Sequence, residues 1–451
     1  MSATNLATKS ELGSEQNDVV VVGGGLAGLL AATKLAKGGR RVVLLEQAKG
    51  LGGRAATTVK GELRFNLGPR ALYLHGHAHR LLKELDVPFT GDFPNTGKGM
   101  GVYGGKEHQL PRNVSQIFTT TLLSWREKWQ LFRFFQQIPT LETASLQHTS
   151  LTEWVTTHYG SGAIANLLFG LFRLSTYAAD LDALSAGATL DQFRIGLSGN
   201  VWYIDGGWQA IVDQLRDIAQ QAGVQIRTGA HVHAVRNFES GVLVQATHQP
   251  DLRASAAILA VSPQVASLLL GLPEQHALVR WAVEARPVQA ACLDLALSQL
   301  PRPEHRFELG LDEPTYASVH SAAAQFAPPG VAVIHVMKYL PSETNESARD
   351  HEQQLERVLD RWQPGWHSHV LARRYLPAMT VTHALPQAAH GGVAGRPQVA
   401  VANYPNVYLA GDWVGQRGQL ADASAASAET AVNLILNGST ATNDVRELEY
   451  A

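Results

Sequence analysis

The pattern of apolar positions near the start of the chain changes its period at residue 23. Residues 18–22 (DVVVV) form a β-branched run, typical of a strand buried on both faces. The apolar residues then recur at helical spacing, at Leu26, Leu29, Leu30 and Leu35. Residues 41–45 form another apolar run and predict a second strand. The run 19–32 is too short to cross a membrane, so strand, helix and strand indicate a soluble fold with a buried parallel sheet.

Hydrophobic period and turn residues predict further elements along the chain. In order, these are a hairpin turning at Lys60 and Gly61, helices over 113–200, a helix and strands over 201–235, strands at 241–247, 255–261 and within 305–340, a helix from Ser342, a strand at 407–410 and a small-residue helix from about Leu420. Strands thus alternate with helices over much of the chain, which favours an α/β fold.

Three glycines stand at the junction of the first strand and helix. Gly23, Gly25 and Gly28 form G-x-G-x-x-G, and the second strand ends in Glu46. The first glycine allows a tight turn, the second lets a pyrophosphate approach the backbone, and the third lets helix and strand pack closely. Glu46 follows the glycines by roughly the 20 residues expected of an acid that binds a ribose. The context favours a dinucleotide site over an ordinary glycine-rich turn.

Composition excludes several other classes of protein. The chain has 451 residues, enough for two or three domains, and a formal net charge of −2, so it lacks the basic field that nucleic-acid binding uses. Its single cysteine, Cys292, excludes an internal disulfide framework and a cysteine-rich metal or iron–sulfur site. Residues 1–17 are polar without the apolar core of a secretory signal, which predicts a disordered leader and a cytoplasmic protein.

An aromatic and basic stretch lies within the helical region. Between 122 and 135 it combines tryptophans and phenylalanines with three cationic residues, Arg126, Lys128 and Arg133. One interpretation is a helix packed inside a substrate domain. The other is an amphipathic surface that touches lipid or admits a lipophilic substrate, because basic and aromatic residues together suit a membrane interface. Peripheral membrane contact therefore remains open at this stage.

Four motifs in order carry a resemblance to a known family. They are VVGGGLAGL, LGGR at 51–54, DGGW at 205–208 and the C-terminal VYLAGDW. Together they resemble the flavin-containing amine oxidase, protoporphyrinogen oxidase and phytoene desaturase superfamily. The resemblance implies FAD, held by a Rossmann-like, doubly wound domain with an inserted α+β substrate domain. The implied ranges are 18–90, 200–263 and 395–440 for FAD, 91–199 and 264–394 for substrate, and 441–451 for a tail.

The resemblance also implies which residues contact each part of FAD. Around the pyrophosphate it places Gly23, Gly25, Leu26, Ala27, Gly28, Gly53 and Arg54. Glu46 would hold the adenosine ribose, and the backbone of Val232 would meet adenine. The segment Gly68, Pro69 and Arg70 would pass the isoalloxazine ring, and Gly411, Asp412 and Leu420 would lie at the ribityl chain and the last helix. A solvated surface charge is the alternative for Arg54, and a structural role is the alternative for Arg70.

The branch of the superfamily is less well defined by the motifs. Amine oxidases commonly place a lysine near the flavin, and in the strand of ARPVQAACLDLAL, Gln289 stands about where that lysine is expected. Of their aromatic cage, only Trp413 with Tyr375 is a candidate pair. The sequence LADASAASAETA is closer in character to phytoene-dehydrogenase-like proteins, whose substrates are long hydrocarbons. The candidates near the reacting atoms are Arg70, Trp413 and Tyr203, and Tyr177 and Tyr203 are either cavity-lining or ordinary core tyrosines.

The resemblance implies hydride transfer from a substrate C–H to flavin N5, with oxygen or a quinone as the electron acceptor. A desaturase acting on a lipophilic substrate is the first hypothesis. The second is an oxidase of amines or amino acids that releases peroxide. The third is a non-enzymatic prenyl-binding escort protein, which the presence of Glu46, Arg54 and Asp412 disfavours.

Three histidines, His75, His77 and His79, invite a metal interpretation. No carboxylate accompanies them, and the segment resembles a loop that enters a helix, so no metal is expected. A histidine near the flavin could act as an acid or a base, because the side chain titrates in the useful range.

Overall fold

The computed structural model describes residues 17–238 and 240–438. The predicted tail, 441–451, lies outside these ranges, as does the predicted leader except for its last residue. Asn17 is buried as the first residue of a strand and lies opposite Ala254. Asn17 therefore belongs to this strand and not to the predicted leader.

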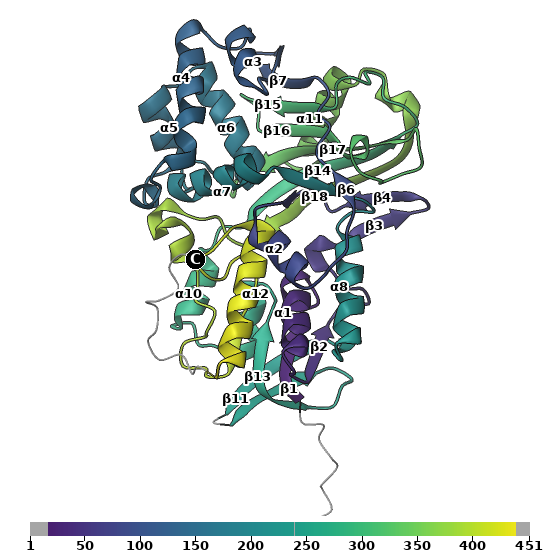
Figure 1. Cartoon of the computed structure of the whole chain (residues 1–451), viewed down its shortest axis with the longest axis vertical. Coiled ribbons are helices and arrows are strands. Elements are labelled where there is room, and N and C mark those ends of the chain that lie inside the picture. The colour runs from purple at the N-terminus through teal and green to yellow at the C-terminus, as the bar shows by residue number, and fades with distance from the viewer. Residues whose placement is uncertain (1–16, 239, 439–451) are drawn as a thin grey trace, which may run out of the picture.

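The first large sheet has seven strands and occupies the lower half of the molecule (Figure 1). Its parallel strands are β10 (Gln225–Thr228), β2 (Val42–Glu46), β1 (Asn17–Val22), β13 (Leu252–Leu259) and β19 (Val407–Leu409), in that order. The antiparallel strands β12 (Gly241–Ala246) and β11 (Val232–Phe238) continue the sheet from the N-terminal half of β13. The strands predicted at 18–22 and 41–45 are confirmed.

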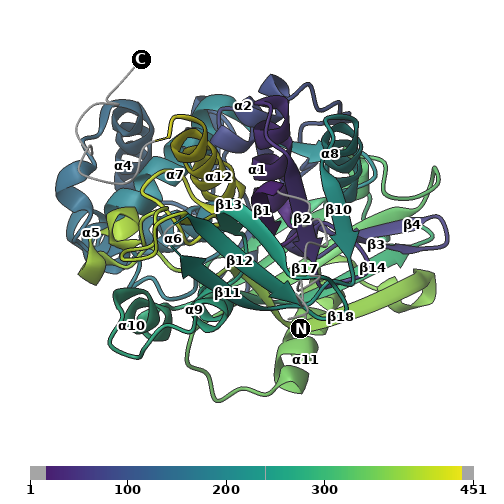
Figure 2. The same ribbon diagram turned by 90° about the horizontal axis from the view of Figure 1, so that it is seen from below.

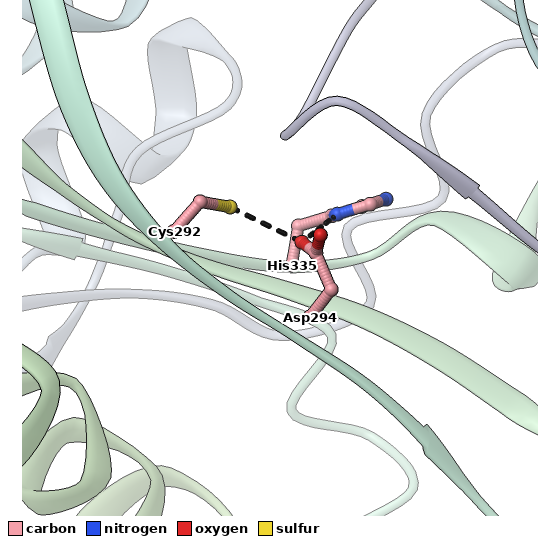
Figure 3. A group of neighbouring side chains, drawn as sticks. All are labelled: Cys292, Asp294 and His335. Atoms are coloured by element: carbon pink, nitrogen blue, oxygen red, sulfur yellow. Dashed lines mark hydrogen bonds and ion pairs between the residues drawn. The ribbon is translucent and has the colours of Figure 1, made fainter. Parts of the chain in front are cut away.

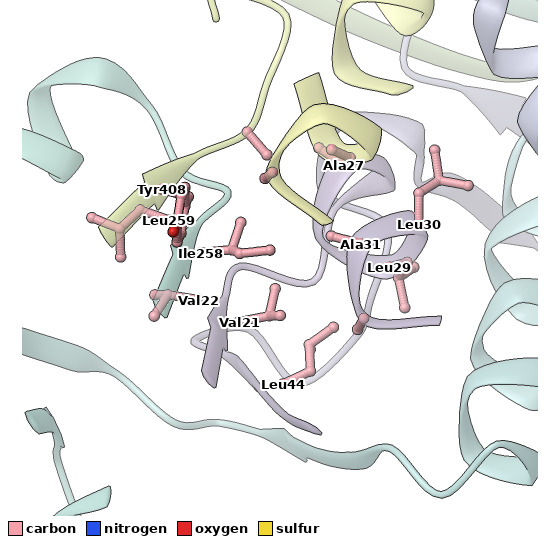
Figure 4. Close-up of a cluster of buried hydrophobic side chains, with 14 of the residues drawn as sticks. Val21, Val22, Ala27, Leu29, Leu30, Ala31, Leu44, Ile258, Leu259 and Tyr408 are labelled. Atoms are coloured by element: carbon pink, nitrogen blue, oxygen red, sulfur yellow. The ribbon is translucent and has the colours of Figure 1, made fainter. Parts of the chain in front are cut away.

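Helices cover both faces of this sheet, as Figure 2 shows from below. On one face lie α1 (Leu26–Lys37), α2 (His77–Glu84), α8 (Gln209–Gln221) and α12 (Leu420–Leu436), with α1 between α8 and α12. α9 (Pro263–Leu270) packs against β11, and α10 (Ala277–Glu284) packs against α9. Alanine-rich α1 and α12 let their backbones approach closely, and β1, α1, β2, β13 and β19 share one buried apolar core (Figure 4).

The second large sheet also has seven strands and lies in the upper half of the molecule. Its order is β18 (Val370–Thr382), β14 (Val288–Leu297), β17 (Ala332–Leu340), β16 (Thr315–Val319), β15 (Phe307–Gly310), β7 (Gly99–Tyr103) and β8 (Lys106–Gln109). Side chains of β14 alternate between two cores. Ala291, Leu293 and Leu295 share a core with α11 (Ala348–Trp362), whereas Ala290 and Cys292 share one with helices from 114–199.

The region predicted as helical, 113–200, is helical. It contains α3 (Val114–Thr119), α4 (Trp125–Gln137), α5 (Leu151–Tyr159), α6 (Ala163–Thr176) and α7 (Ala186–Gly199). The hairpin predicted at Lys60 is β3 (Thr57–Lys60) with β4 (Leu63–Asn66). A small sheet joins β5 (Leu72–Tyr73), β9 (Val201–Ile204) and β6 (Gly91–Asp92).

One predicted helix start is wrong. The helix expected from Ser342 begins at Ala348, because Ser347 and Asp350 form a capping box that fixes the first turn there. The chain is a mixed α/β fold built on several sheets. Within 17–238 and 240–438, no helix is both long and apolar enough to span a lipid bilayer.

Candidate functional site

The parallel strands of the first sheet end side by side at one edge. Val22, the last residue of β1, lies opposite Leu45 of β2 and Leu259 of β13, and Leu259 in turn lies opposite Leu409 of β19. The loops that follow β1, β2 and β19 therefore meet at this edge. In open α/β sheets this edge is where ligands bind.

The glycine loop after β1 has the geometry expected of a phosphate cradle. Gly23 has a φ of +106°, and a Cβ at Gly28 would overlap the carbonyl oxygen of Gly23, so both positions require glycine. Gly25 is the N-cap of α1, and the nearest atom to a Cβ built there is the carbonyl oxygen of Gly52, 3.9 Å away. Leu26 and Ala27 form the first turn. Within the described residues no side chain caps α1 and its first turn has no acid, so its amides can bind an anion.

The loop after β2 lies against this cradle. Glu46 accepts hydrogen bonds from the backbone N–H of Gly24 through Oε2, at 2.6 Å, and of Ala48 through Oε1, at 2.8 Å. The N–H of Gly52 donates to the carbonyl oxygen of Gly24, at 2.8 Å, which brings Gly53 and Arg54 next to the glycines. The LGGR segment and Glu46 thus lie where the resemblance places a pyrophosphate contact and a ribose-binding acid, and those roles stay predictions.

The loop after β19 supplies a buried carboxylate. Asp412 is 2% exposed, pairs with Arg54, and lies 3.2 Å from Nδ1 of His383 through Oδ1. Burial acts to raise the pKa of Asp412, but Arg54 and His383 outweigh it, so the pKa lies well below its ordinary value. Gly411 before it donates its N–H to Ser427 Oγ of α12, at 2.9 Å. Asp412 is therefore an ionised acceptor fixed at the edge of the sheet.

Two further arginines surround this carboxylate. Burial and the neighbouring charge of Arg54 lower the pKa of Arg70 to about 10, and burial lowers that of Arg396 to about 10. Arg396 donates to the carbonyl oxygen of Gly418 at 2.8 Å, while its Nε has no partner among the described residues. Asp412 interacts electrostatically with all three guanidinium groups. Three positive groups and one carboxylate leave a surplus that suits a pyrophosphate.

Arg396 and His383 were not predicted from the sequence. Each is a single polar residue in a segment without a regular hydrophobic period, and Asp412 is their partner only after folding. Their spacing along the chain therefore gives no indication of the site.

The segment Gly68, Pro69 and Arg70 runs between the two large sheets. Tyr177, at the end of α6, donates its hydroxyl to the carbonyl oxygen of Pro69 at 3.1 Å. A Cβ built on Gly68 would lie 3.6 Å from Sγ of Cys292 and would crowd Met379. Arg70 donates from Nε to the carbonyl oxygen of Leu67, at 3.2 Å. The segment therefore faces β14 and β18 of the second sheet.

Gln289 lies on the face of β14 that points away from Gly68, and its correspondence to the lysine of amine oxidases stays a prediction. The ladder between β14 and β17 is regular from Gln289 to Leu297, although the ladder to β18 shifts register at three places, and the side chains from Ala290 to Leu295 alternate between the two faces of β14. The face that meets Gly68 carries Ala290 and Cys292, and Gln289 has the opposite orientation. Within β14 that face has no lysine.

A hydrogen-bonded group lies beside this segment (Figure 3). Asp294 Oδ1 accepts from Sγ of Cys292 at 3.1 Å and lies 2.5 Å from Nδ1 of His335, and all three residues are fully buried. Their ligand atoms lie within 4.8 Å of one another, as in a metal site. However, Arg374 donates from Nε to Asp294 Oδ2 at 3.0 Å, and burial and Asp294 raise the pKa of the Cys292 thiol well above its ordinary value. We interpret the group as a hydrogen-bond network, because a metal prefers thiolate and an unneutralised carboxylate.

Two of the three candidates near the reacting atoms lie in packed cores. Trp413 is fully buried, donates its indole N–H to the carbonyl oxygen of Val261 at 3.0 Å, and stacks on Trp281 with ring centroids 5.6 Å apart. Tyr375 instead donates to Ala348 beside α11, so the expected pairing of Trp413 with Tyr375 is wrong. Tyr203 is buried, stacks on His320 and lies 3.4 Å from the hydroxyl of Tyr316. A packing role explains these contacts.

The remaining predicted residues occupy ordinary structural positions. α2 begins at His77, so His75 precedes the helix, where its Nδ1 lies 3.3 Å from Ser198 Oγ. Val232 is the buried first residue of β11, and Leu420 begins α12 as expected. Their proposed contacts with adenine and the ribityl chain stay predictions.

The family of this protein follows from comparison with known proteins. The family model described as flavin containing amine oxidoreductase matches residues 26–436. The chain belongs to this family, which confirms the resemblance and the flavin expected from the motifs.

Individual relatives cover only part of the chain. A carotenoid 3,4-desaturase from Haloarcula japonica is 26% identical over 273 residues, 53% of this chain and 54% of the relative. A 4,4'-diaponeurosporene oxygenase from Staphylococcus aureus is 23% identical over 256 residues, 49% of this chain and 50% of the relative. These matches span about half of each relative. The solved structure of cyclohexylamine oxidase from Brevibacterium oxydans shares the fold, with a TM-score of 0.68 and 16% identity over 94% of this chain and 99% of that one.

Proposed function

We propose that this protein is an FAD-dependent oxidoreductase that removes a hydride from a C–H bond of a hydrophobic, isoprenoid-like substrate. The observation that carries this proposal is the composition of the β14 face beside Gly68. It presents Ala290 and the protonated thiol of Cys292, with Met379 of β18 nearby, and no lysine. Apart from Asp294, which is paired with Arg374 and hydrogen-bonded to His335, this face is apolar, which suits a hydrocarbon, and the carotenoid-type names of two relatives agree with it.

The first sheet and its loops form the proposed Rossmann-like FAD domain. In this assignment α9 and α10, residues 263–284, belong with the FAD domain, because their apolar side chains share the core of the first sheet. The second sheet, with α3 to α7 and α11, forms the substrate domain. The proposed boundary therefore moves from residue 263 to the loop after Glu284.

Each group at the carboxyl edge has a part in holding FAD. Arg54, Arg70 and Arg396 would neutralise the pyrophosphate at the N-terminus of α1, Glu46 would accept from ribose hydroxyls, and Asp412 from the ribityl chain. When bound, FAD supplies the acceptor for the two electrons and the hydrogen of the C–H bond. The protein orients the substrate against Gly68 and Pro69 and excludes water with Tyr177 and Met379. Oxygen or a quinone is the proposed acceptor of the electrons, and a membrane is the proposed source of the substrate.

An oxidase of amines is the second candidate, favoured by the family to which the chain belongs. Purified protein is examined for the flavin spectrum and then titrated without oxygen with linear isoprenoids and with aliphatic amines. We expect bleaching by an isoprenoid and a product with an added C=C bond. Bleaching by an amine, with peroxide released on admission of oxygen, would establish the second candidate. A protein that takes up no FAD would refute both.

A further inference from the structure

Five apolar side chains, three exposed and two partly buried, form a patch on α3 and α4, the helices at the top of Figure 1. This α3–α4 patch consists of Val114, Phe118, Trp125, Trp129 and Phe132. Trp125 is 64% exposed, Val114 51% and Trp129 45%. Phe118 is at the centre, with its ring centroid 5.8 Å from that of Trp125, 5.2 Å from Trp129 and 5.8 Å from Phe132. The rings thus form one contiguous surface.

The helix geometry turns the two tryptophans of this patch away from the core of the protein, against which Phe118 and Phe132 are partly packed. Positions 125, 129 and 132 are spaced by four and three residues, so they share one face of α4. The opposite face carries Leu131, Phe134 and Ile138, which are buried against the other helices. Packing within the chain therefore accounts for one face of the helix and leaves two tryptophans exposed. Large exposed apolar patches mark interaction sites.

The segment that carries the patch is mainly positive, although the whole chain has a formal net charge of −2. Arg112, Arg126, Lys128 and Arg133 lie between residues 112 and 137, and Glu127 is the only acid in that range. The carboxylate of Glu127 accepts hydrogen bonds from the N–H of Ser124, at 2.8 Å, and from the N–H of Ile164, at 3.2 Å. An α-helix turns by about 100° per residue. Lys128 therefore lies on one side of the face of α4 that carries positions 125, 129 and 132, and Arg126 and Arg133 lie on the other side.

We propose that the α3–α4 patch docks on the surface of an anionic lipid bilayer. Indole rings have an apolar body and a polar N–H, which suits the headgroup level, and flanking cations bind lipid phosphates. Lys128 lies 5.9 Å from the ring centroid of Trp125, so charge and aromatic surface meet the lipid together. The proposal rests on the proposed function in that a lipophilic substrate would be taken from this membrane.

The test is cosedimentation of the full chain with vesicles of phosphatidylcholine alone and of phosphatidylcholine with phosphatidylglycerol. We expect binding to the anionic vesicles that weakens as salt is raised. The double variant Trp125→Ala/Trp129→Ala should bind at least about tenfold more weakly, and Arg126→Gln/Lys128→Gln about fivefold more weakly for each cation removed. The matched control is Leu268→Ala, which shortens a side chain that is 76% exposed on α9 and should bind as the native chain does.

Equal binding of the tryptophan variant and the native chain would overturn the proposal, as would an absence of binding to anionic vesicles. A concentration-dependent dimer that the tryptophan variant abolishes, without vesicle binding, would assign the patch to a second copy instead. Flavin content and circular dichroism check that each variant is folded. Vesicle binding needs no substrate, so the two proposals can fail separately. A native chain that oxidises an isoprenoid but does not bind vesicles would refute the docking of the α3–α4 patch on lipid and leave the proposed function intact.

Discussion

At the scale of single residues, charge is the feature that defines the candidate site. Asp412 is buried with Arg54 and His383 in contact, and Arg70 and Arg396 lie within its electrostatic influence. A buried cation without a counterion costs several kcal/mol, so the surplus is stable only with a bound anion or with lowered pKa values. Burial lowers the pKa values of both arginines, and a bound anion would supply the negative charge that their guanidinium groups lack.

Arg396→Met tests the role of this surplus. Without FAD, the variant should be as stable as the native chain or more stable, because a buried charge with an unpartnered Nε is removed. With FAD, a lost charge-assisted contact of about 1.5–3 kcal/mol should weaken binding roughly 10- to 100-fold. Titration of the apoprotein with FAD, with thermal unfolding in parallel, measures both effects. Arg216→Met, on the surface of α8, is the control, and equal FAD affinity of Arg396→Met would contradict the assignment.

Glu46→Ala tests the proposed ribose contact. The substitution removes the acceptor for the N–H groups of Gly24 and Ala48, at about 1 kcal/mol for each bond, and removes any bond to the ribose. We therefore expect loss of FAD during gel filtration. Glu46→Gln, which retains one acceptor oxygen, should keep more of it. Native retention of FAD by the alanine variant would show that Glu46 does not hold the ribose.

At the scale of elements, a buried carboxyl group at the junction of α12 with α2 should make the free energy of unfolding depend on pH. Asp422 is in the first turn of α12, and its Oδ1 accepts from the N–H of Ala78 in α2 at 2.8 Å, while Oδ2 has no partner among the described residues. Burial raises the pKa of Asp422 to about 6. The contribution of this carboxyl to stability is therefore fully present below its unfolded pKa of about 4 and is lost as the pH rises to about 6.

Asp422→Asn should remove this pH dependence. Asparagine keeps an acceptor for the N–H of Ala78 but never ionises, so the free energy of unfolding should rise at pH 7 by up to roughly 3 kcal/mol. Near pH 3.5 the variant and the native chain should differ little. Thermal unfolding across this pH range is the measurement. A variant that shifts stability equally at both pH values would show that the proton on Asp422 is not involved.

The elements also show how far the sequence could be interpreted. Strands at 18–22, 41–45 and 407–410 were predicted within a residue or two, because full burial on both faces gives a continuous apolar run. The glycine loop and Glu46 could also be identified, because their pattern lies within one short segment of the sequence. The start of α11 was wrong, because a capping box decides it. Arg396 and His383 were missed because their partner becomes a neighbour only in the folded chain.

At the scale of the whole molecule, one buried ion pair joins two strands of the second sheet to the β3–β4 hairpin, which precedes the Gly68–Arg70 segment. Arg374 of β18 binds Asp294 of β14 and the backbone of Asn66, and it donates to Thr58 Oγ1 at 2.8 Å. Asn66 ends the β3–β4 hairpin, immediately before the Gly68–Arg70 segment. The partners of Arg374 are thus 80 to more than 300 positions away. Contacts of this range fix the second sheet against the hairpin that leads into the Gly68–Arg70 segment.

Removal of one member of the Arg374–Asp294 ion pair should therefore lower the free energy of unfolding much more than removal of both. Arg374→Met leaves Asp294 charged and fully buried, which should lower the free energy of unfolding by about 3–5 kcal/mol. In Arg374→Met/Asp294→Asn no charge is left without a counterion, and the amide oxygen can still accept from His335, so most of the stability should return. Denaturant unfolding of the native chain, both single variants and the double variant gives the coupling energy. If the double variant is as unstable as Arg374→Met, the lost stability comes from the contacts of Arg374 with Thr58 and Asn66. In that case the hydrogen bonds to the β3–β4 hairpin, rather than the ion pair, hold the hairpin against the second sheet.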